Sequence, residues 1–276
     1  MIPARDAALT IPRVLSACQE QDYPETSREI LVVDDHSRDD TARLAAAWGA
    51  RVLSLAGSAT GPAAARNLGW KSSRGEIILF LDSDCRPFPS WIRKMVAALD
   101  GQAGAVAGSG YSYPAGLHGW PRLIGLECSW RHRRLSGPVP YLGSFNLALP
   151  RPALERSGGF DETYPAPSGE DNDLSYRLIQ HGYALRFLPD NCVEHLARPT
   201  PWRYLRRQAR HGYSRLRLYA RHPRYLLGDG YSTLRDFAAV PLALATLPAW
   251  TLSPPAGFLL LAAWLALQFP VMRFLT

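Results

Sequence analysis

Short apolar runs alternate with amphipathic segments through the first third of the chain. Residues 30–35 (Ile-Leu-Val-Val-Asp-Asp) and 77–82 (Ile-Ile-Leu-Phe-Leu-Asp) are continuous apolar stretches that end in carboxylates, as buried parallel strands do. Between them the pattern predicts two helices, 40–48 and 62–73, and a further short strand, 51–55. The alternation of strands and helices predicts a Rossmann-like, doubly wound and mostly parallel α/β sheet.

The remainder of the α/β region has a less regular pattern. A helix is predicted over residues 7–19, and the strand expected before it looks truncated because the chain starts so close to the helix. Residues 101–150 are rich in Gly, Pro and aromatic residues with weak periodicity, so irregular strands and loops are expected there. A helix over 170–180 and a strand over 184–188 are predicted to follow.

Two segments of unusual composition follow. Residues 198–224 contain nine arginines and no acidic residue, interleaved with aromatic and leucine side chains, which predicts one or two basic amphipathic helices. Residues 237–275 carry one charge, Arg273, and divide at Ser253-Pro254-Pro255 into two apolar runs, each shorter than the about 20 residues of a bilayer span. Tilted or re-entrant membrane helices fit this pattern, and so do buried or interfacial helices.

Composition narrows the possible partners. The 276-residue chain is 47% hydrophobic, so a folded core is expected, and its formal net charge is +7. The positive charge is almost entirely arginine, which suits phosphate-bearing partners such as nucleotides or anionic lipid, although an arginine-rich genome would give the same balance. The four cysteines lie far apart, which indicates reduced thiols. No signal-peptide pattern opens the chain, so its bulk is expected in the cytosol.

Carboxylates cluster where the predicted strands end. Asp34 and Asp35 close one strand, and Asp82-Ser83-Asp84 closes another. Ligands of an open α/β sheet bind beyond the carboxyl ends of its strands. If the chain turns at Ser83, both flanking carboxylates can face one Mg²⁺ or Mn²⁺, which carboxylates commonly hold together with substrate phosphates. Alone, a D-x-D is a weak motif that a solvated loop also carries, and the first pair would equally suit a helix N-cap cluster.

Six short motifs are more informative as a set. They read V-D-D-H-S-x-D-x-T from Val33, G-P-A-A-A-R-N-x-G from Gly61, D-S-D from Asp82, G-S-F-N from Gly143, G-G-F-D-E from Gly158 and G-E-D-x-D-L from Gly169. In this order and spacing they resemble the family 2 inverting glycosyltransferases of the GT-A type, over residues 2–195. The resemblance implies a GT-A fold, a nucleotide-diphospho-sugar donor, a divalent metal and an acceptor hydroxyl.

The resemblance implies donor-binding roles for the residues that match its first motifs. Asp35, with Asp34 as the close competitor, would accept hydrogen bonds from the nucleoside base or ribose. Arg66 and Asn67 would brace the aspartate cluster or reach the nucleotide, although a plain surface ion pair would also explain Arg66.

The D-x-D is implied to meet the metal and the sugar nucleotide. Asp82 would contact the ribose or the metal, Asp84 would chelate the metal, and Ser83 would lie between them in the donor site. The metal would neutralise the leaving diphosphate, where negative charge grows. His195, just after a predicted strand, matches a position where many GT-A enzymes place a third metal ligand, whereas a lone histidine is more often structural.

Glu170-Asp171 resembles the family's acidic pair, in which the aspartate is the general base. Inversion by a single displacement needs one carboxylate to take the proton of the acceptor hydroxyl, and Asp171 is the candidate. The alternative is that the pair only favours a helix dipole. Arg207 and Arg210 loosely resemble a diphosphate-holding segment of membrane-associated relatives, with His211 in place of its tryptophan.

These predictions define three regions: a GT-A domain at residues 1–197, a basic interfacial segment at 198–235, and a hydrophobic membrane segment at 236–276. We expect metal-dependent, inverting sugar transfer at the cytosolic face of the cytoplasmic membrane, to a glycan or lipid-linked acceptor. A catalytically inactive glycosyltransferase-like protein that binds nucleotide or membrane is the alternative. A nucleic-acid partner is not expected, because the apolar tail beside the arginines favours lipid.

Overall fold

The structure, a computed structural model, covers all three predicted regions. It describes residues 1–100, 104–113, 116–133, 135, 137–164, 168–196, 200–226 and 234–275. The predicted boundary at residues 197/198, and residues 227–233 of the predicted basic segment, lie outside the described residues.

Three parallel strands begin the sheet, in the order β1-β2-β3: β1 (Ile2–Ala4), β2 (Leu31–Asp34) and β3 (Arg51–Ser54). The helices between them are α1 (Ile11–Gln19) and α2 (Thr41–Ala47), and α3 (Pro62–Ser72) follows. The strand expected before the first helix is therefore present at residues 2–4. The predicted helix over 7–19 starts later, at Ile11, because the Ala7 carbonyl accepts the Thr10 and Ile11 amides in a turn.

The second half of the sheet is mixed, which corrects the expectation of a mostly parallel sheet. Its strand order is β4-β9-β6-β10-β8, and β9 runs antiparallel to both of its neighbours. The strands are β4 (Ile77–Leu81), β6 (Ala105–Gly108), β8 (Gly137–Pro138), β9 (Asn146–Pro150) and β10 (Ala184–Phe187). A continuous apolar run shows that a strand is buried but does not give its direction. Hydrogen bonds from the Met1 amino group to Leu79 O (2.8 Å) and from Leu81 N to Met1 O (3.1 Å) join the two halves.

Helices cover the second half, and one of them was not expected. They are α4 (Trp91–Leu99), α5 (Gly119–Arg133), α6 (Arg151–Ser157) and α7 (Glu170–Gln180). The prediction of α7 is confirmed at both ends. The helix α5 lies in the region predicted to be irregular, because its Gly, Pro and aromatic residues hide the helical period. A small third sheet joins β5 (Cys85–Arg86), β7 (Tyr111–Ser112) and β11 (Val193–His195).

Two buried clusters pack the helices against the sheet. One brings Ile11 and Leu15 of α1 and Met95 of α4 together with β1 and β2. The other brings Trp70 of α3, Leu154 of α6 and Leu174 and Leu178 of α7 together with β4, β9 and β10. Because the apolar strands are buried by helices, the polar ends of the strands are left to form a site.

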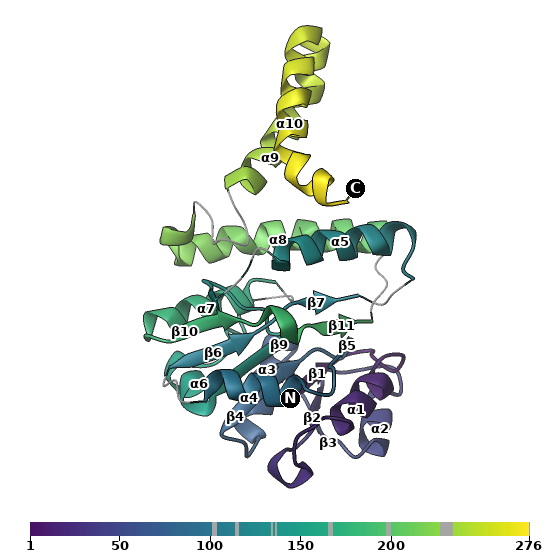
Figure 1. The fold of residues 1–276 in the computed structure, drawn as a ribbon, viewed down its shortest axis with the longest axis vertical. Coiled ribbons are helices and arrows are strands. Elements are labelled where there is room, and N and C mark those ends of the chain that lie inside the picture. Colours follow the sequence, from purple (N-terminus) through teal and green to yellow (C-terminus); the bar gives the residue numbers. More distant parts are fainter. Residues whose placement is uncertain are drawn as a thin grey trace.

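The C-terminal region is mostly helical where it is described. The basic segment forms one helix, α8 (Pro201–Arg221), and the apolar segment forms α9 (Leu234–Leu252) and α10 (Pro254–Leu275), with the predicted break at Ser253. Helices α5 and α8 lie side by side, with the Tyr204 hydroxyl 3.3 Å from Glu127 Oε2. They form a layer between β7 and β11 and the projecting pair α9 and α10 (Figure 1). None of the helices in the described residues combines the length and apolarity that crossing a membrane requires.

Candidate active site

The D-x-D lies in a turn directly after β4, which is the condition under which both carboxylates can face one cation. The Cys85 amide donates to Asp82 O over 3.0 Å, which closes the turn, and the Asp82 and Asp84 side chains remain 31% and 35% exposed. Asp84 Oδ2 lies 3.4 Å from His195 Nε2, at the end of β11. The turn therefore leaves both carboxylates partly exposed and pairs one of them with the predicted histidine.

A buried arginine connects the D-x-D with the acidic pair of α7. The Arg66 side chain, 4% exposed, donates from Nη2 to Asp82 Oδ1 (2.8 Å) and from Nη1 to Glu170 Oε1 (3.1 Å). A planar guanidinium holds two carboxylates in fixed directions, and charge-assisted hydrogen bonds are the stronger kind. Arg66 thus braces the acidic cluster, and it is not a surface ion pair.

The cluster has more negative than positive charge. Burial raises the pKa of Asp82, and the charges of Asp84 and Asp171 add to this while Arg66 opposes it. Burial and the charge of Asp171 likewise raise the pKa of Glu170 above its usual range. For Asp84 the burial is outweighed by the hydrogen bond and charge of His195, and its pKa is lowered. One buried arginine among several carboxylates leaves an electrostatic site suited to a cation.

Asp171 has the accessibility that Glu170 lacks. Glu170 is 2% exposed, and its Oε1 is taken by Arg66. Asp171 is only partly buried, and its Oδ2 accepts the Ser144 amide over 3.2 Å. Ser144 belongs to the G-S-F-N motif, so the backbone of that motif orients the candidate base. The first turn of α7 therefore separates a buried, paired carboxyl from one that a substrate can reach.

Asp34 and Asp35 each have one carboxylate oxygen without a partner in the described residues. Asp35 Oδ2 accepts the Gly61 amide over 3.0 Å, and Asp34 Oδ2 accepts the Ser37 amide over 3.3 Å. The Oδ1 atoms of both side chains are buried and have no partner in the described part of the chain. A buried acceptor without a partner costs about 1–3 kcal/mol, so these atoms suit donors from a bound molecule. The N-cap of α2 is Asp40, and the pair therefore does not cap that helix.

Asn67 braces a loop instead of the aspartate cluster. Its Nδ2 donates to Phe160 O (2.8 Å) and Glu162 Oε1 (2.7 Å), and its Oδ1 accepts the Phe160 amide (2.9 Å). These bonds hold the G-G-F-D-E segment against α3. Asn67 therefore acts on the structure around the site, and none of these bonds points toward the D-x-D.

Arg207 and Arg210 lie on α8 beside His211, whose Nδ1 is 2.8 Å from Ser168 Oγ. Ser168 lies just before α7, so this part of α8 is close to the first turn of that helix. Burial and the charge of Arg207 lower the pKa of His211, and the charge of Asp171 opposes them. In the residues that the structure describes, no ion pair links either arginine to the acidic cluster.

Asp84 and His195 form a pair that could take part in metal binding. Where the chain is described, no group of three or more His, Cys, Asp or Glu side chains is placed to hold a metal. The Nδ1 of His195 is buried and has no described partner, and the rings of Tyr111 and Tyr113 lie 4.6 and 5.8 Å from the imidazole. These tyrosines lacked a sequence signal, because they fall in the stretch of weak periodicity.

The fold and the site define a GT-A-like α/β glycosyltransferase. The family model described as glycosyl transferase family 2 matches residues 1–158, and the chain belongs to that family. The chain is 29% identical to glycosyltransferase AglE of Haloferax volcanii over 92% of this chain and 81% of that protein. It is 34% identical to the pre-mycofactocin glycosyltransferase of Mycobacterium tuberculosis over 59% of this chain, and it spans 36% of that protein.

Solved structures support the fold at low sequence identity. The mannosyltransferase PcManGT of Pyrobaculum calidifontis, in complex with GDP-Man and Mn²⁺, matches with a TM-score of 0.71 and 22% identity, over 99% of this chain and 81% of that one. TarS residues 1–349 of Staphylococcus aureus, in complex with UDP-GlcNAc, match with a TM-score of 0.58 and 21% identity, over 72% of this chain and 58% of that one. The GT-A-like arrangement therefore extends beyond the residues that the family model matches.

Proposed function

We propose that this glycosyltransferase transfers a sugar from a nucleotide-diphospho-sugar to an acceptor hydroxyl, with inversion, at the cytosolic face of the membrane. The observation that carries the proposal is the bridge from Arg66 to Asp82 and Glu170. This bridge places the donor-side carboxylates beside Asp171, so the two halves of a displacement reaction share one site.

The proposed reaction is a single displacement. The acceptor hydroxyl gives its proton to Asp171, and its oxygen forms a bond to the anomeric carbon of the sugar. The bond from that carbon to the diphosphate oxygen breaks, and the nucleoside diphosphate leaves with the electron pair. The partial exposure of Asp171 and its hydrogen bond from the Ser144 amide support this role. Entry opposite the leaving group inverts the configuration.

The donor would lie along the polar ends of the strands. The unpartnered Oδ1 atoms of Asp34 and Asp35 would accept hydrogen bonds from the nucleoside. Asp84 and His195 would hold a divalent cation, Mn²⁺ or Mg²⁺, and the donor diphosphate would complete its coordination. The cation would stabilise negative charge on the leaving group. Mn²⁺ accompanies GDP-Man in the Pyrobaculum neighbour, which supports this choice of cofactor.

The membrane part of the proposal rests on an exposed face of α8. Trp202, Leu205, Tyr213 and Leu216 are 67%, 55%, 70% and 72% exposed and recur at helical spacing. Exposed arginines flank this stripe: Arg203, Arg206 and Arg210.

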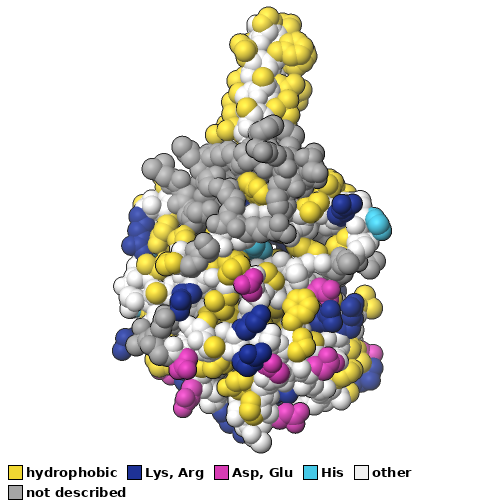
Figure 2. Space-filling model, viewed as in Figure 1, with side chains coloured by type: hydrophobic (Ala, Val, Ile, Leu, Met, Phe, Trp, Pro, Cys, Tyr) yellow, Lys and Arg dark blue, Asp and Glu magenta, His cyan; other side chains and the backbone are white. Residues whose placement is uncertain are grey.

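The projecting helices α9 and α10 extend the exposed apolar surface, with Leu247 and Leu252 at 77% and 87% exposure (Figure 2). Apolar side chains with flanking arginines favour the surface of an anionic lipid leaflet. The acceptor would then be a glycan or a lipid-linked molecule presented at that surface.

The test of the reaction is Asp171→Asn in the full chain. The amide keeps the shape of the side chain but cannot take a proton, so transfer should fall about 10² to 10⁴-fold. Donor turnover is measured by release of nucleoside diphosphate across a panel of UDP- and GDP-sugars with Mn²⁺. Binding of the nucleoside diphosphate alone should not change.

Asp190→Asn is the matched control, because Asp190 is exposed and lies outside the site. If the Asp171 variant transfers sugar at nearly the wild-type rate, another carboxyl is the base, with Glu170 next in line.

A further inference from the structure

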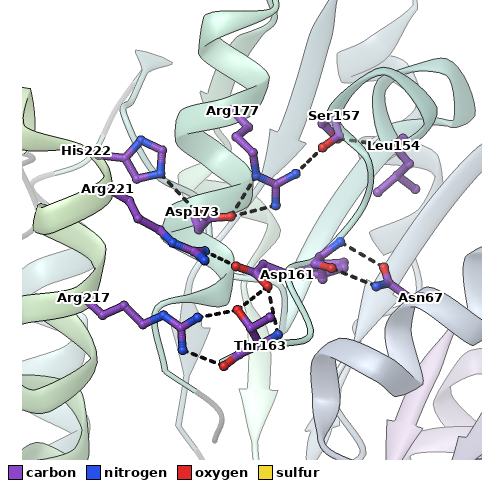
Figure 3. Close-up of polar contacts among 11 residues, drawn as sticks. Asn67, Leu154, Ser157, Asp161, Thr163, Asp173, Arg177, Arg217, Arg221 and His222 are labelled. Atoms are coloured by element: carbon purple, nitrogen blue, oxygen red, sulfur yellow. Dashed lines mark hydrogen bonds and ion pairs between the residues drawn. The ribbon is translucent and has the colours of Figure 1, made fainter. Parts of the chain in front are cut away.

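A second polar network lies on the side of α7 that faces away from Asp171. It joins α8 to α7 and to the loop after α6 through Asp161, Asp173, Arg177, Arg221 and His222 (Figure 3). All five residues contribute to the lining of a cavity of about 480 Å³. None of them is assigned a role in the proposed reaction.

Asp173 is the centre of this network. Its side chain is 4% exposed, its Oδ1 lies 2.9 Å from His222 Nε2, and its Oδ2 accepts Arg177 Nε over 2.8 Å. His222 is 8% exposed and packs edge-on against the ring of Tyr176, with 5.1 Å between centroids. A buried carboxylate that loses one of two partners retains its desolvation cost, so the pair resists separation.

Asp173 and Asp171 are two residues apart on one helix. At 3.6 residues per turn they point about 200° apart, so they lie on nearly opposite sides of α7. On one side Asp171 meets the Ser144 amide, and on the other Asp173 meets His222 at the end of α8. Fixing Asp173 therefore fixes the rotation of the first turn of α7, and with it the direction of the Asp171 carboxylate.

The loop after α6 is tied to the same end of α8. Arg221 pairs with Asp161, and Arg217 Nη1 donates to Thr163 O over 2.6 Å (Figure 3). The other side of this loop is held by Asn67, which neighbours Arg66 on α3. The end of α8 is thus joined directly to α7, and through this loop it is joined to α3, which carries Arg66.

We propose that His222 is a positioning residue, which acts through Asp173 to aim Asp171 at the acceptor hydroxyl. This inference rests on the proposed function of Asp171. It also gives α8 a second role: one face is exposed toward the proposed lipid surface, while the opposite face holds the helix of the candidate base.

The test compares His222→Leu with His222→Gln in the full-length protein. Leucine removes the donor to Asp173, whereas glutamine restores an amide donor. A small misplacement of a reacting group costs up to about 100-fold in rate, so we expect kcat of the leucine variant to fall about 10 to 100-fold. The donor KM and the affinity for nucleoside diphosphate should change less than about threefold, since the donor residues are untouched. Glutamine should recover most of the rate.

His181→Leu is the matched control, because His181 is exposed at the other end of α7 and should leave every parameter unchanged. Should the leucine variant fail to fold, His222→Asn is used instead, since its shorter amide cannot reach Asp173. The coupling between His222 and Asp171 is then measured with the double variant. If His222 acts through Asp171, loss of the His222 donor should have little further effect on the residual rate of the Asp171→Asn protein.

An equal loss of rate in both backgrounds, or an unchanged kcat in the leucine variant, would overturn the positioning role. A wild-type protein without transfer to any acceptor would instead contradict the proposed function itself.

Discussion

At the scale of single side chains, the site combines paired charges with buried polar atoms that have no hydrogen-bond partner in the described residues. Arg66 compensates Asp82 and Glu170 inside the protein, where an unpaired carboxylate would be costly. Asp84 lies 3.4 Å from His195 and keeps a partly exposed carboxylate, which a metal with a diphosphate would complete. Residue-level substitutions should therefore separate metal binding from proton transfer.

Asp84→Ala removes the carboxylate of the proposed metal pair. Affinity for UDP or GDP should lose its stimulation by Mn²⁺, while the weaker affinity without metal should stay at the wild-type value. Calorimetry with and without Mn²⁺ measures both. Asp100→Ala, at an exposed position after α4, is the control. Equal affinities of the Asp84 variant and the wild type in Mn²⁺ would exclude Asp84 as a ligand.

His132 predicts a pH dependence of stability. Its Nδ1 accepts the Tyr111 amide over 3.2 Å, and burial, with the charge of Arg131, lowers its pKa from 6.5 to about 4. Between these values the unfolded chain binds a proton that the folded protein does not bind. The free energy of unfolding should therefore fall as the pH drops from about 6.5 to 4, by up to about 1.4 kcal/mol per pH unit from this group.

The measurement for His132 is denaturant unfolding across this range, in comparison with His132→Asn. Asparagine keeps an acceptor near the Nδ1 position but does not titrate. The difference between the two proteins isolates the histidine from the other titrating groups. Parallel curves would show that the folded protein protonates His132 at its ordinary pKa.

At the scale of elements, the loop between α6 and α7 connects the two halves of the site. It starts with Gly158 and Gly159, both at positive φ (77° and 72°), and it is held by Asn67 on one side and by α8 on the other. A methyl group at Gly159 would lie 2.6 Å from Asn67 Oδ1, whereas one at Gly158 would meet nothing within 4 Å. A substitution at Gly158 therefore tests backbone strain alone, whereas one at Gly159 tests backbone strain together with close packing.

Gly158→Ala should cost about 1–2 kcal/mol, the ordinary price of a left-handed alanine. Gly159→Ala adds the collision with Asn67, and overpacking of this kind costs about 1–3 kcal/mol more. We expect Gly159→Ala to be the more destabilising variant in denaturant unfolding and to lower transfer, because the loop supports the acidic cluster. Equal losses from both variants would mean that Asn67 can move away freely.

At the scale of the whole molecule, the protein is arranged in layers. The α/β domain comes first, α5 and α8 cover one edge of it, and α9 and α10 project beyond them (Figure 1). Helix α8, which carries exposed apolar residues, lies between the α/β domain and the projecting helices (Figure 1). This arrangement is the basis for the proposal that the catalytic domain is held close to a lipid surface.

The membrane prediction is tested by flotation of the full-length protein with vesicles. Binding to anionic vesicles should exceed binding to neutral ones, and part of it should persist at high salt because of the apolar stripe. Each arginine near an anionic surface contributes about 1 kcal/mol, so replacing Arg203, Arg206 and Arg210 with glutamine should weaken anionic binding roughly a hundredfold. Protein that remains monomeric in buffer and ignores vesicles would contradict the membrane proposal.

Much of the secondary structure of this protein could be predicted from signals between neighbouring residues. Apolar runs located β2, β3 and β4, and capping and glycine signals located α3 and α7, because period and turn chemistry depend on neighbouring residues. The helix break at Ser253 was predictable for the same reason. The six motifs carried the family, since each places specific side chains at fixed spacing.

Only the tertiary structure decided which distant residues meet. Arg66 and Glu170 are 104 positions apart, and neither segment predicts that the buried arginine joins two carboxylates. The same is true of the insertion of β9 antiparallel to β4, the helix α5, and the pairing of His222 with Asp173. Such contacts depend on how whole elements pack, and packing between distant segments leaves no periodic trace in the chain.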